Sequence, residues 1–231
     1  EQFARMKTIV DLLENSAQKY GDNPYILEKK DKRYEAATRE AIRDGWLYTG
    51  DMGYMDQDGF LYVLGRYKSL LISDDGEKYS PEGIEETITD RSALLDQMML
   101  FNNQNKYTTA LVVPNRDALA RLAKGNNISI TDDTGLAFIL NEIKSVLNQY
   151  MPGGIYADLF PSRWLPSAIA VLDEPFNADN KQLNSLGKMV RARIVEKHKD
   201  TIEYLYTPEA KNMVNSRNLE SIRKILMPSS Q

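Results

Sequence analysis

Two short stretches place a reactive side chain directly after a glycine. Asp51 follows Gly50, and its carboxylate offers two acceptor oxygens at a strand end, which suits both hydroxyls of a ribose. Arg66 follows Gly65, and its permanently charged guanidinium can reach a sugar or phosphate oxygen. Taken singly, such residues more often cap a turn or remain solvated. Their order along the chain favours a nucleotide site.

A third stretch, Gly76-Glu77-Lys78-Tyr79-Ser80-Pro81, combines glycine with charged residues ahead of an expected helix. Pro81 can begin that helix because its missing N–H costs nothing at the first position. Glu82 and Glu85 suit the positive end of the helix dipole.

Together, the three stretches resemble the late motifs of the adenylate-forming superfamily, which includes acyl-CoA synthetases, firefly luciferase and the adenylation domains of peptide synthetases. The resemblance implies that Asp51 binds the ATP ribose, that Arg66 assists it and that Lys68 is a hinge. It also implies that a loop of the third stretch lines the tunnel for the pantetheine arm of CoA: Gly76, Glu77 and Lys78.

A fourth stretch, residues 176–191, resembles the long-chain acyl-CoA synthetase version of the last family motif. In that motif, a lysine in a polar loop opens the final helix and contacts carboxylate and phosphate oxygens during adenylation. The match assigns this catalytic role to Lys188, and Gly187 before it would allow close approach to a ligand. Lys181 remains a competitor, because residues 184–186 depart from the usual Thr-Pro-Thr.

The superfamily also needs a phosphate-binding loop rich in Ser, Thr and Gly, and a glutamate that holds Mg²⁺. Residues 1–44 contain no such loop, although residues 6–34 resemble the beginning of the same enzymes. The chain is therefore expected to hold both ends of a synthetase without its central body, through a deletion, an omission from the sequence or a gene loss. The expected domains are an N-terminal remnant of the large domain, the end of that domain and a mobile C-terminal domain: residues 1–38, 39–66 and 67–231.

Composition excludes several other classes of protein. The 231 residues carry a net charge of −4 with no basic face, which argues against nucleic-acid binding. There is no cysteine, and the one histidine, His198, lies on an expected exposed helical stretch, so a thiolate site, a catalytic triad and a histidine metal cluster are not expected. No apolar run or signal peptide indicates a membrane or secreted protein, which makes the cytoplasm the expected location, with peripheral membrane contact still possible.

Short strands mixed with helices must position these residues. Residues 46–54 and 60–64 are expected to pair as a hairpin across Asp58-Gly59. Further strands are expected at 70–73, 98–101, 108–113 and 168–172, with helices starting at Pro81, around 119–125, and over 139–150 and 186–198. The polar segment 126–134 is expected to be a loop. Five residues are expected in the core: Leu100, Leu111, Val113, Ile169 and Val171.

This pattern predicts an α+β fold, namely a small C-terminal domain with a short mixed sheet and packed helices, preceded by a hairpin from the end of the large domain. Within the expected helix 186–198, Lys188 could also be no more than a solvated residue of the first turn.

The resemblance implies an AMP-forming long-chain fatty acid–CoA ligase that uses fatty acid, ATP and CoA, with Mg²⁺ held by the missing body. The chain alone is expected to be inactive. Two alternatives stay open: another adenylate-forming enzyme, such as a fatty acyl-AMP ligase that serves a carrier protein, and a truncated, non-catalytic binding or regulatory module.

Overall fold

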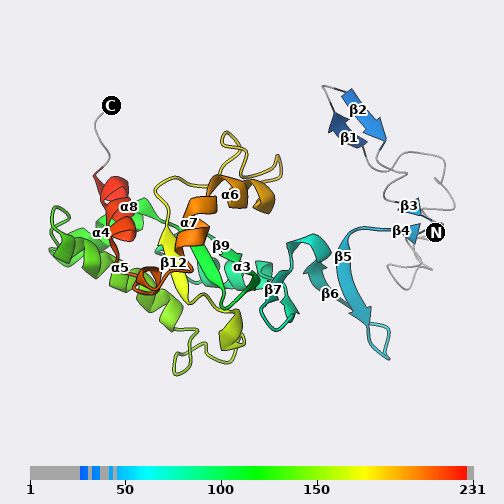
Figure 1. Ribbon diagram of the computed structural model, residues 1–231, viewed down its shortest axis with the longest axis horizontal. Coiled ribbons are helices and arrows are strands. Elements are labelled where there is room, and N and C mark those ends of the chain that lie inside the picture. The colour runs from blue at the N-terminus through cyan, green and yellow to red at the C-terminus, as the bar shows by residue number, and fades with distance from the viewer. Residues whose placement is uncertain (1–26, 31–32, 37–41, 44–45, 228–231) are drawn as a thin grey trace, which may run out of the picture. The chain divides into compact units, whose positions relative to one another are not determined.

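The chain divides into two compact units, Glu1–Tyr67 and Lys68–Gln231, in the computed structural model shown in Figure 1. The structure describes residues 27–30, 33–36, 42–43 and 46–227. Of residues 6–34, which resemble the beginning of the adenylate-forming enzymes, residues 6–26, 31 and 32 lie outside the described residues.

The described residues of the first unit form three antiparallel strand pairs. They are β1 (Leu27–Lys30) with β2 (Arg33–Ala36), β3 (Ile42–Arg43) with β4 (Trp46–Leu47), and β5 (Asp51–Met55) with β6 (Leu61–Arg66). The last pair is the predicted hairpin. Its first strand starts later than expected, because Trp46 and Leu47 pair with β3 and Gly50 then takes a positive φ of 79°.

The turn of this hairpin follows from its sequence. The Asp56 side chain accepts hydrogen bonds from the backbone N–H groups of Asp58 (3.0 Å) and Phe60 (2.9 Å). Gly59 has a φ of 83°, which glycine adopts without a steric cost. Local chemistry therefore fixes the reversal that brings β6 back beside β5.

A three-stranded mixed sheet lies at the centre of the second unit, in the order β12-β11-β9. Strand β11 (Thr109–Pro114) runs antiparallel to β9 (Leu95–Phe101) and parallel to β12 (Ala168–Val171). A smaller sheet has the order β10-β7-β8 and consists of Leu71–Ser73 (β7), Lys78–Tyr79 (β8) and Asn103–Asn105 (β10). Strand β10 lies between the predicted strands 98–101 and 108–113, where no strand is expected from the sequence.

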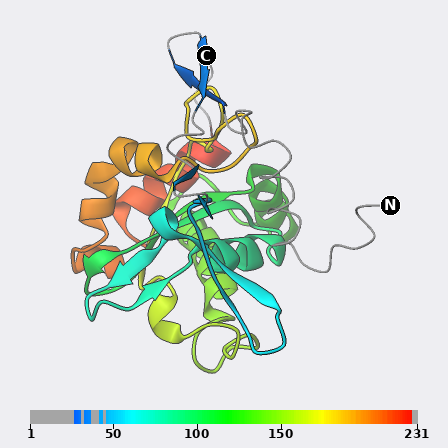
Figure 2. The same cartoon turned by 90° about the vertical axis from the view of Figure 1, so that its right-hand side faces the viewer.

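Side chains from alternate positions of the central sheet enter two apolar clusters, one on each face. One cluster packs against helices α3 (Glu82–Asp90), α4 (Arg116–Gly125), α5 (Asp133–Asn148) and α8 (Ser216–Leu226). The other packs against α6 (Arg191–Lys197) and α7 (Lys199–Tyr204). Figure 2 shows α6 and α7 in orange on the opposite side from α4 and α5 in green. All five residues predicted for the core are buried.

Short 3₁₀ turns and side-chain caps complete the second unit. The 3₁₀ turns are η2 (Tyr67–Ser69, at its junction with the first unit), η3 (Ser162–Trp164) and η4 (Glu209–Lys211). Asn115 caps α4, and Asp132 caps α5 through the N–H of Gly135 at 2.8 Å. Because of this cap, α5 begins at Asp133, and the predicted loop 126–134 is wrong at its last two residues.

The helix predicted over 186–198 is also wrong at its start, since α6 begins at Arg191. Asn184 accepts hydrogen bonds from the N–H groups of Leu186 (2.9 Å) and Lys188 (3.0 Å), which gives the backbone an alternative to the helix. Gly187 has a φ of 74°, which is incompatible with a right-handed helix. Local turn chemistry therefore delays the helix by about a turn and a half.

These elements confirm the α+β class and the hairpin that precedes the packed domain. Among the helices of the described residues, none combines the length and apolar character that crossing a membrane requires.

Candidate functional site

Asp51 and Arg66 lie side by side in the first unit. They face each other in the register of β5 and β6, and Arg66 Nε is 3.2 Å from Asp51 Oδ1. The backbone beside them is closed by a 2.9 Å hydrogen bond from Tyr67 N to the carbonyl of Gly50. The side chains are 40% and 63% exposed, so the ion pair stabilises the fold little and both groups are open to a ligand.

Lys68 lies in η2 and is the first residue of the second unit. A short 3₁₀ turn at a boundary between two compact units is a place where a few backbone dihedrals can absorb a change in orientation. The hinge role itself stays a prediction.

Lys188 lies at the end of a tight turn rather than in a helix. The turn is closed by hydrogen bonds from Asn184 N to Lys188 O (2.9 Å) and from Gly187 N to Asn184 O (3.0 Å), and by an isolated bridge between Leu183 and Met189. Lys188 is exposed, and Leu186 at the tip is 80% exposed. The interpretation of Lys188 as a residue of the first helical turn is therefore wrong, and the lysine is presented by a fixed loop.

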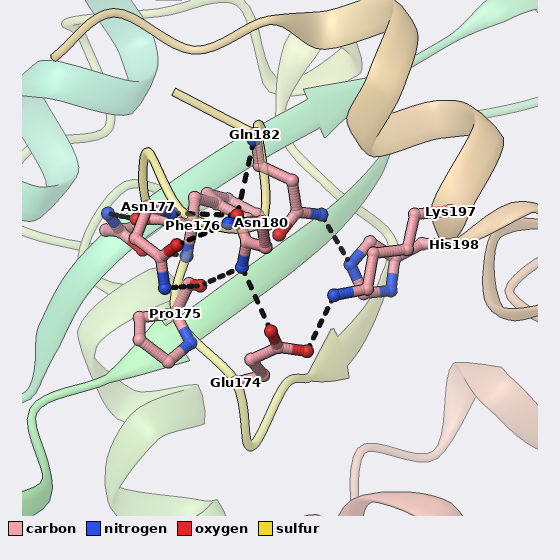
Figure 3. Close-up of polar contacts among 9 residues, drawn as sticks. Glu174, Pro175, Phe176, Asn177, Asn180, Gln182, Lys197 and His198 are labelled. Atoms are coloured by element: carbon pink, nitrogen blue, oxygen red, sulfur yellow. Dashed lines mark hydrogen bonds and ion pairs between the residues drawn. The ribbon is translucent and has the colours of Figure 1, made fainter. Parts of the chain in front are cut away.

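The segment before this turn is held by the polar network of Figure 3. Asn177 and Asn180 exchange hydrogen bonds from backbone N–H to side-chain oxygen, at 3.1 and 2.8 Å. Asn180 also donates to Glu174 (3.0 Å), which forms an ion pair with Lys197 of α6 at 2.6 Å. Residues 174–180 are therefore attached to the helix that follows the Lys188 turn.

His198 joins the same network and is not the exposed residue that the sequence predicts. It is half-buried, its ring packs edge-on against Phe176, and its Nε2 lies 3.0 Å from Gln182 Nε2. Burial lowers the pKa of His198, with a further contribution from Lys197. A neutral ring can accept the hydrogen bond that the Gln182 amide donates. The histidine thus supports the loop structurally.

The competing lysine, Lys181, is also exposed. Its φ is 60°, an uncommon conformation for a residue with a side chain, and its carbonyl accepts a 3.3 Å hydrogen bond from Arg193. The Lys181 backbone N–H donates to the carbonyl of Ala178, so Lys181 continues the segment 174–180, whereas Lys188 ends a separate turn. Both assignments remain predictions.

Arg191 anchors the beginning of α6 to the rest of the second unit. Its Nη2 contacts both carboxylate oxygens of Glu85 in α3, and its Nη1 donates to the carbonyl of Leu100 at 3.0 Å. Leu100 in turn donates its N–H to Glu85. Burial raises the pKa of Glu85, which is 3% exposed, while Arg191 and the Leu100 N–H oppose that rise.

The sequence predicts only a helix-dipole role for Glu85 and no role for Arg191. The only local signal is that an arginine follows the predicted catalytic lysine by three residues. Glu85 is 106 positions away, and no local pattern pairs two residues at that separation.

The loop predicted to line the CoA tunnel connects β7 and β8. Gly76 has a φ of 85° and donates its N–H to Ser73 O at 3.0 Å. The Glu77 carboxylate is occupied by Arg163 and Trp164 of η3. These contacts fix the Glu77 side chain, while Gly76 and Lys78 are exposed. The CoA-tunnel role of all three residues stays a prediction.

Within the described part of the chain, no group of three or more acidic, histidine or cysteine residues is arranged to hold a metal ion.

The comparisons first define the class of domain. Residues 68–149 match the family described as the AMP-binding enzyme C-terminal domain. The adenylation domain of the carboxylate reductase from Mycobacterium chelonae has a similar fold, with a TM-score of 0.58 and 23% identity over 78% of this chain and 27% of that one. These matches confirm the resemblance to adenylate-forming enzymes and the fold class.

The particular relatives are acyl-CoA ligases. Long-chain-fatty-acid–CoA ligase ACSBG1 of Mus musculus is 30% identical over 199 residues, which cover 78% of this chain and 26% of the relative. The ACSBG1 of Rattus norvegicus is 29% identical over 194 residues, with the same coverage. The 2-succinylbenzoate–CoA ligase of Bacillus mycoides is 53% identical over 62 residues, 27% of this chain and 13% of the relative. The chain thus spans about a quarter of the length of the long-chain ligases.

Proposed function

We propose that residues 46–227 serve as the hairpin and mobile C-terminal domain of an AMP-forming long-chain fatty acid–CoA ligase. The observation that carries this proposal is the Asp51–Arg66 pair directly ahead of a domain that matches the AMP-binding enzyme C-terminal family. The names of the long-chain ligases support the choice of substrate. ATP, fatty acid and CoA are the proposed substrates, with Mg²⁺ bound by a body domain.

The reaction has two steps. A fatty carboxylate attacks the α-phosphate of ATP and releases pyrophosphate, which gives acyl-AMP. The CoA thiol then attacks the acyl carbon, the bond to AMP breaks, and acyl-CoA is formed. Asp51 would accept hydrogen bonds from the ribose hydroxyls, and Arg66 would hold that carboxylate and contact a sugar or phosphate oxygen.

Lys188 is the proposed catalytic residue of the first step. Negative charge grows on the phosphate as the carboxylate attacks, so an ammonium group aimed at it stabilises the transition state more than the ground state. The tight turn from Asn184 to Lys188 supports this role, because it presents the lysine at a fixed place without a helix around it. Rotation of the C-terminal domain about Lys68 would then move Lys188 away from the phosphate. The same rotation would bring the Gly76 loop in to line the pantetheine tunnel.

The test uses a complete ligase in which residues 46–231 are joined to the adenylation body of a homologous long-chain ligase. Lys188→Ala should slow acyl-AMP formation by about two to three orders of magnitude, the usual cost of removing one preorganised donor. Thioester formation from supplied acyl-AMP should remain nearly unchanged. The two half-reactions are followed separately, by pyrophosphate exchange and by acyl-CoA release.

Lys181→Ala is the matched control and should leave both steps largely intact. Lys68→Pro should have the opposite effect to Lys188→Ala, because a fixed φ at the hinge spares adenylation and slows CoA transfer. Equal loss of both steps in Lys188→Ala, or a larger adenylation defect in Lys181→Ala, would place the catalytic lysine elsewhere. Transfer to a carrier protein but not to CoA would favour a fatty acyl-AMP ligase.

A further inference from the structure

The loop around Gly76 is a tight reversal whose own hydrogen bonds involve few residues. Gly76 N donates to Ser73 O (3.0 Å), Ser73 N donates to Glu77 O (2.9 Å), and Glu77 N donates to the Asp75 side chain (3.0 Å). Asp74, Asp75 and Gly76 are exposed. A short exposed reversal of this kind opens easily unless other elements hold it.

Arg163 and Trp164 of η3 stabilise the loop through hydrogen bonds to Glu77. Arg163 Nε and Nη2 donate to separate oxygens of Glu77, each at 2.5 Å, and Trp164 Nε1 donates to one of these oxygens at 3.0 Å. Two parallel N–H···O bonds fix orientation as well as distance, because the guanidinium and the carboxylate are both planar. A segment more than eighty residues away thus defines where the Glu77 side chain lies.

The same 3₁₀ turn also holds the strand that leaves the loop. The Trp164 indole stacks on the ring of Tyr79, with centroids 5.1 Å apart and planes 3° apart. Tyr79 is buried, and its hydroxyl contacts Thr108, which in turn donates to the carbonyl of Arg163 at 3.4 Å. Glu77 and Tyr79 are therefore both attached to η3, one by ionic hydrogen bonds and one by stacking.

We infer that Arg163 and Trp164 are positioning residues for the CoA-dependent step, because they hold the Gly76 loop in the shape that admits the pantetheine arm. The inference rests on the proposed function for the role of the loop. The positioning itself rests on the contacts with Glu77 and Tyr79 alone. Arg163 acts through Glu77 and has no assigned contact with a reacting atom.

The first measurement is hydrogen exchange in the 231-residue chain, which needs no activity. In Arg163→Gln, the amides of Ser73 and Gly76 should exchange about tenfold faster or more, since their hydrogen bonds define the loop. Arg163→Lys keeps the charge but loses the bidentate geometry, so its exchange rates should lie between those of the unsubstituted chain and those of Arg163→Gln. Trp164→Phe keeps an aromatic ring on Tyr79 but loses the donor to Glu77, so a smaller increase is expected.

The second measurement follows both half-reactions in the complete ligase described above. Arg163→Gln should lower kcat/KM for CoA by roughly 10-fold to 100-fold, the cost of a small misplacement of groups at a reacting centre. Acyl-AMP formation should stay within about twofold, because that step does not use the loop. Arg163→Lys should restore part of the loss.

Arg223→Gln is the matched control, because Arg223 forms exposed ion pairs with Asp133 and Glu220 and has none with the loop. It should change neither measurement. Unchanged exchange in Arg163→Gln overturns the positioning role. Faster exchange with an unchanged CoA step, in a ligase that makes acyl-CoA, overturns the functional role and leaves the proposed function standing. An unsubstituted ligase that performs neither half-reaction overturns both the proposed function and the functional role of Arg163 and Trp164.

Discussion

The Glu77 carboxylate shows how one half-buried side chain acquires a specific environment. Hydrogen bonds from Arg163 and then from Trp164 lower its pKa from the ordinary 4.5 to about 2. Both partners favour the charged form, and they outweigh the opposing effect of desolvation. The pair with Arg163 is therefore present throughout the neutral and mildly acidic range.

This shift predicts a defined dependence of stability on pH. Because the folded pKa is depressed, the contribution of Glu77 is fully present above its ordinary pKa and is lost as the pH falls from about 4.5 to about 2. The difference in unfolding free energy between the unsubstituted chain and Glu77→Gln should therefore shrink across that window. Urea denaturation from about pH 6 to about pH 2.5 measures it. A difference that stays constant would contradict the pairing.

At the scale of elements, the turn that carries Lys188 is fixed from both sides. The preceding segment is attached to α6 through Glu174 and Lys197, and the following helix is attached to α3 and β9 through Arg191. Only the turn itself, from Asn184 to Lys188, relies on its own hydrogen bonds. The exposed Lys188 thus lies in a short turn whose flanking segments are both held by ion pairs and hydrogen bonds.

The buried Glu85–Arg191 pair should matter strongly for this anchoring. Arg191→Met leaves the Glu85 carboxylate buried without its main partner, so the unfolding free energy should fall by roughly 3–5 kcal/mol. In the double variant with Glu85→Gln, a neutral amide oxygen can still accept the Leu100 N–H, so part of the loss should be recovered. Urea denaturation of the two single variants and the double variant measures the coupling. Strict additivity of the two losses would show that the pair is not coupled.

At the scale of the whole molecule, the chain covers 26% of the length of the long-chain ligases that it resembles. In the described part of the chain, the candidate nucleotide residues lie in the first unit and the candidate lysine in the second. The described residues also offer no cluster of ligands for a metal ion. Residues 1–44 also contain no phosphate-binding loop, so a bound triphosphate is expected to depend on a body domain.

The 231-residue chain alone should accordingly fail to make acyl-AMP from ATP and a fatty acid. Without a bound triphosphate, Asp51 and Lys188 have no oriented substrate on which to act. Fatty acid-dependent pyrophosphate exchange with the purified chain measures this, and the complete ligase in the same assay is the positive control. Exchange above background with the chain alone would show that it holds a complete adenylation site.

Local patterns in the sequence determined the elements whose causes are local. The Asp58-Gly59 turn and the end of the helix near Gly125 are short-range effects, and the structure has the corresponding hairpin and α4. The resemblance to adenylate-forming enzymes rests instead on short motifs, namely those around Asp51, Arg66 and Gly76 and residues 176–191. Local reasoning was wrong where two local preferences competed, as at Gly187, where turn formation prevailed over the helical pattern.

Only the tertiary structure decided which side chains hold the two candidate loops. Glu77 meets Arg163 across 86 positions, and Glu85 meets Arg191 across 106. Nothing within a helix turn or a strand period specifies such partners, because the contact exists only after β9, β11 and β12 have assembled with helices on both faces. Burial then makes the pairing of Glu85 obligatory, since an unpaired charge in the interior is too costly to keep.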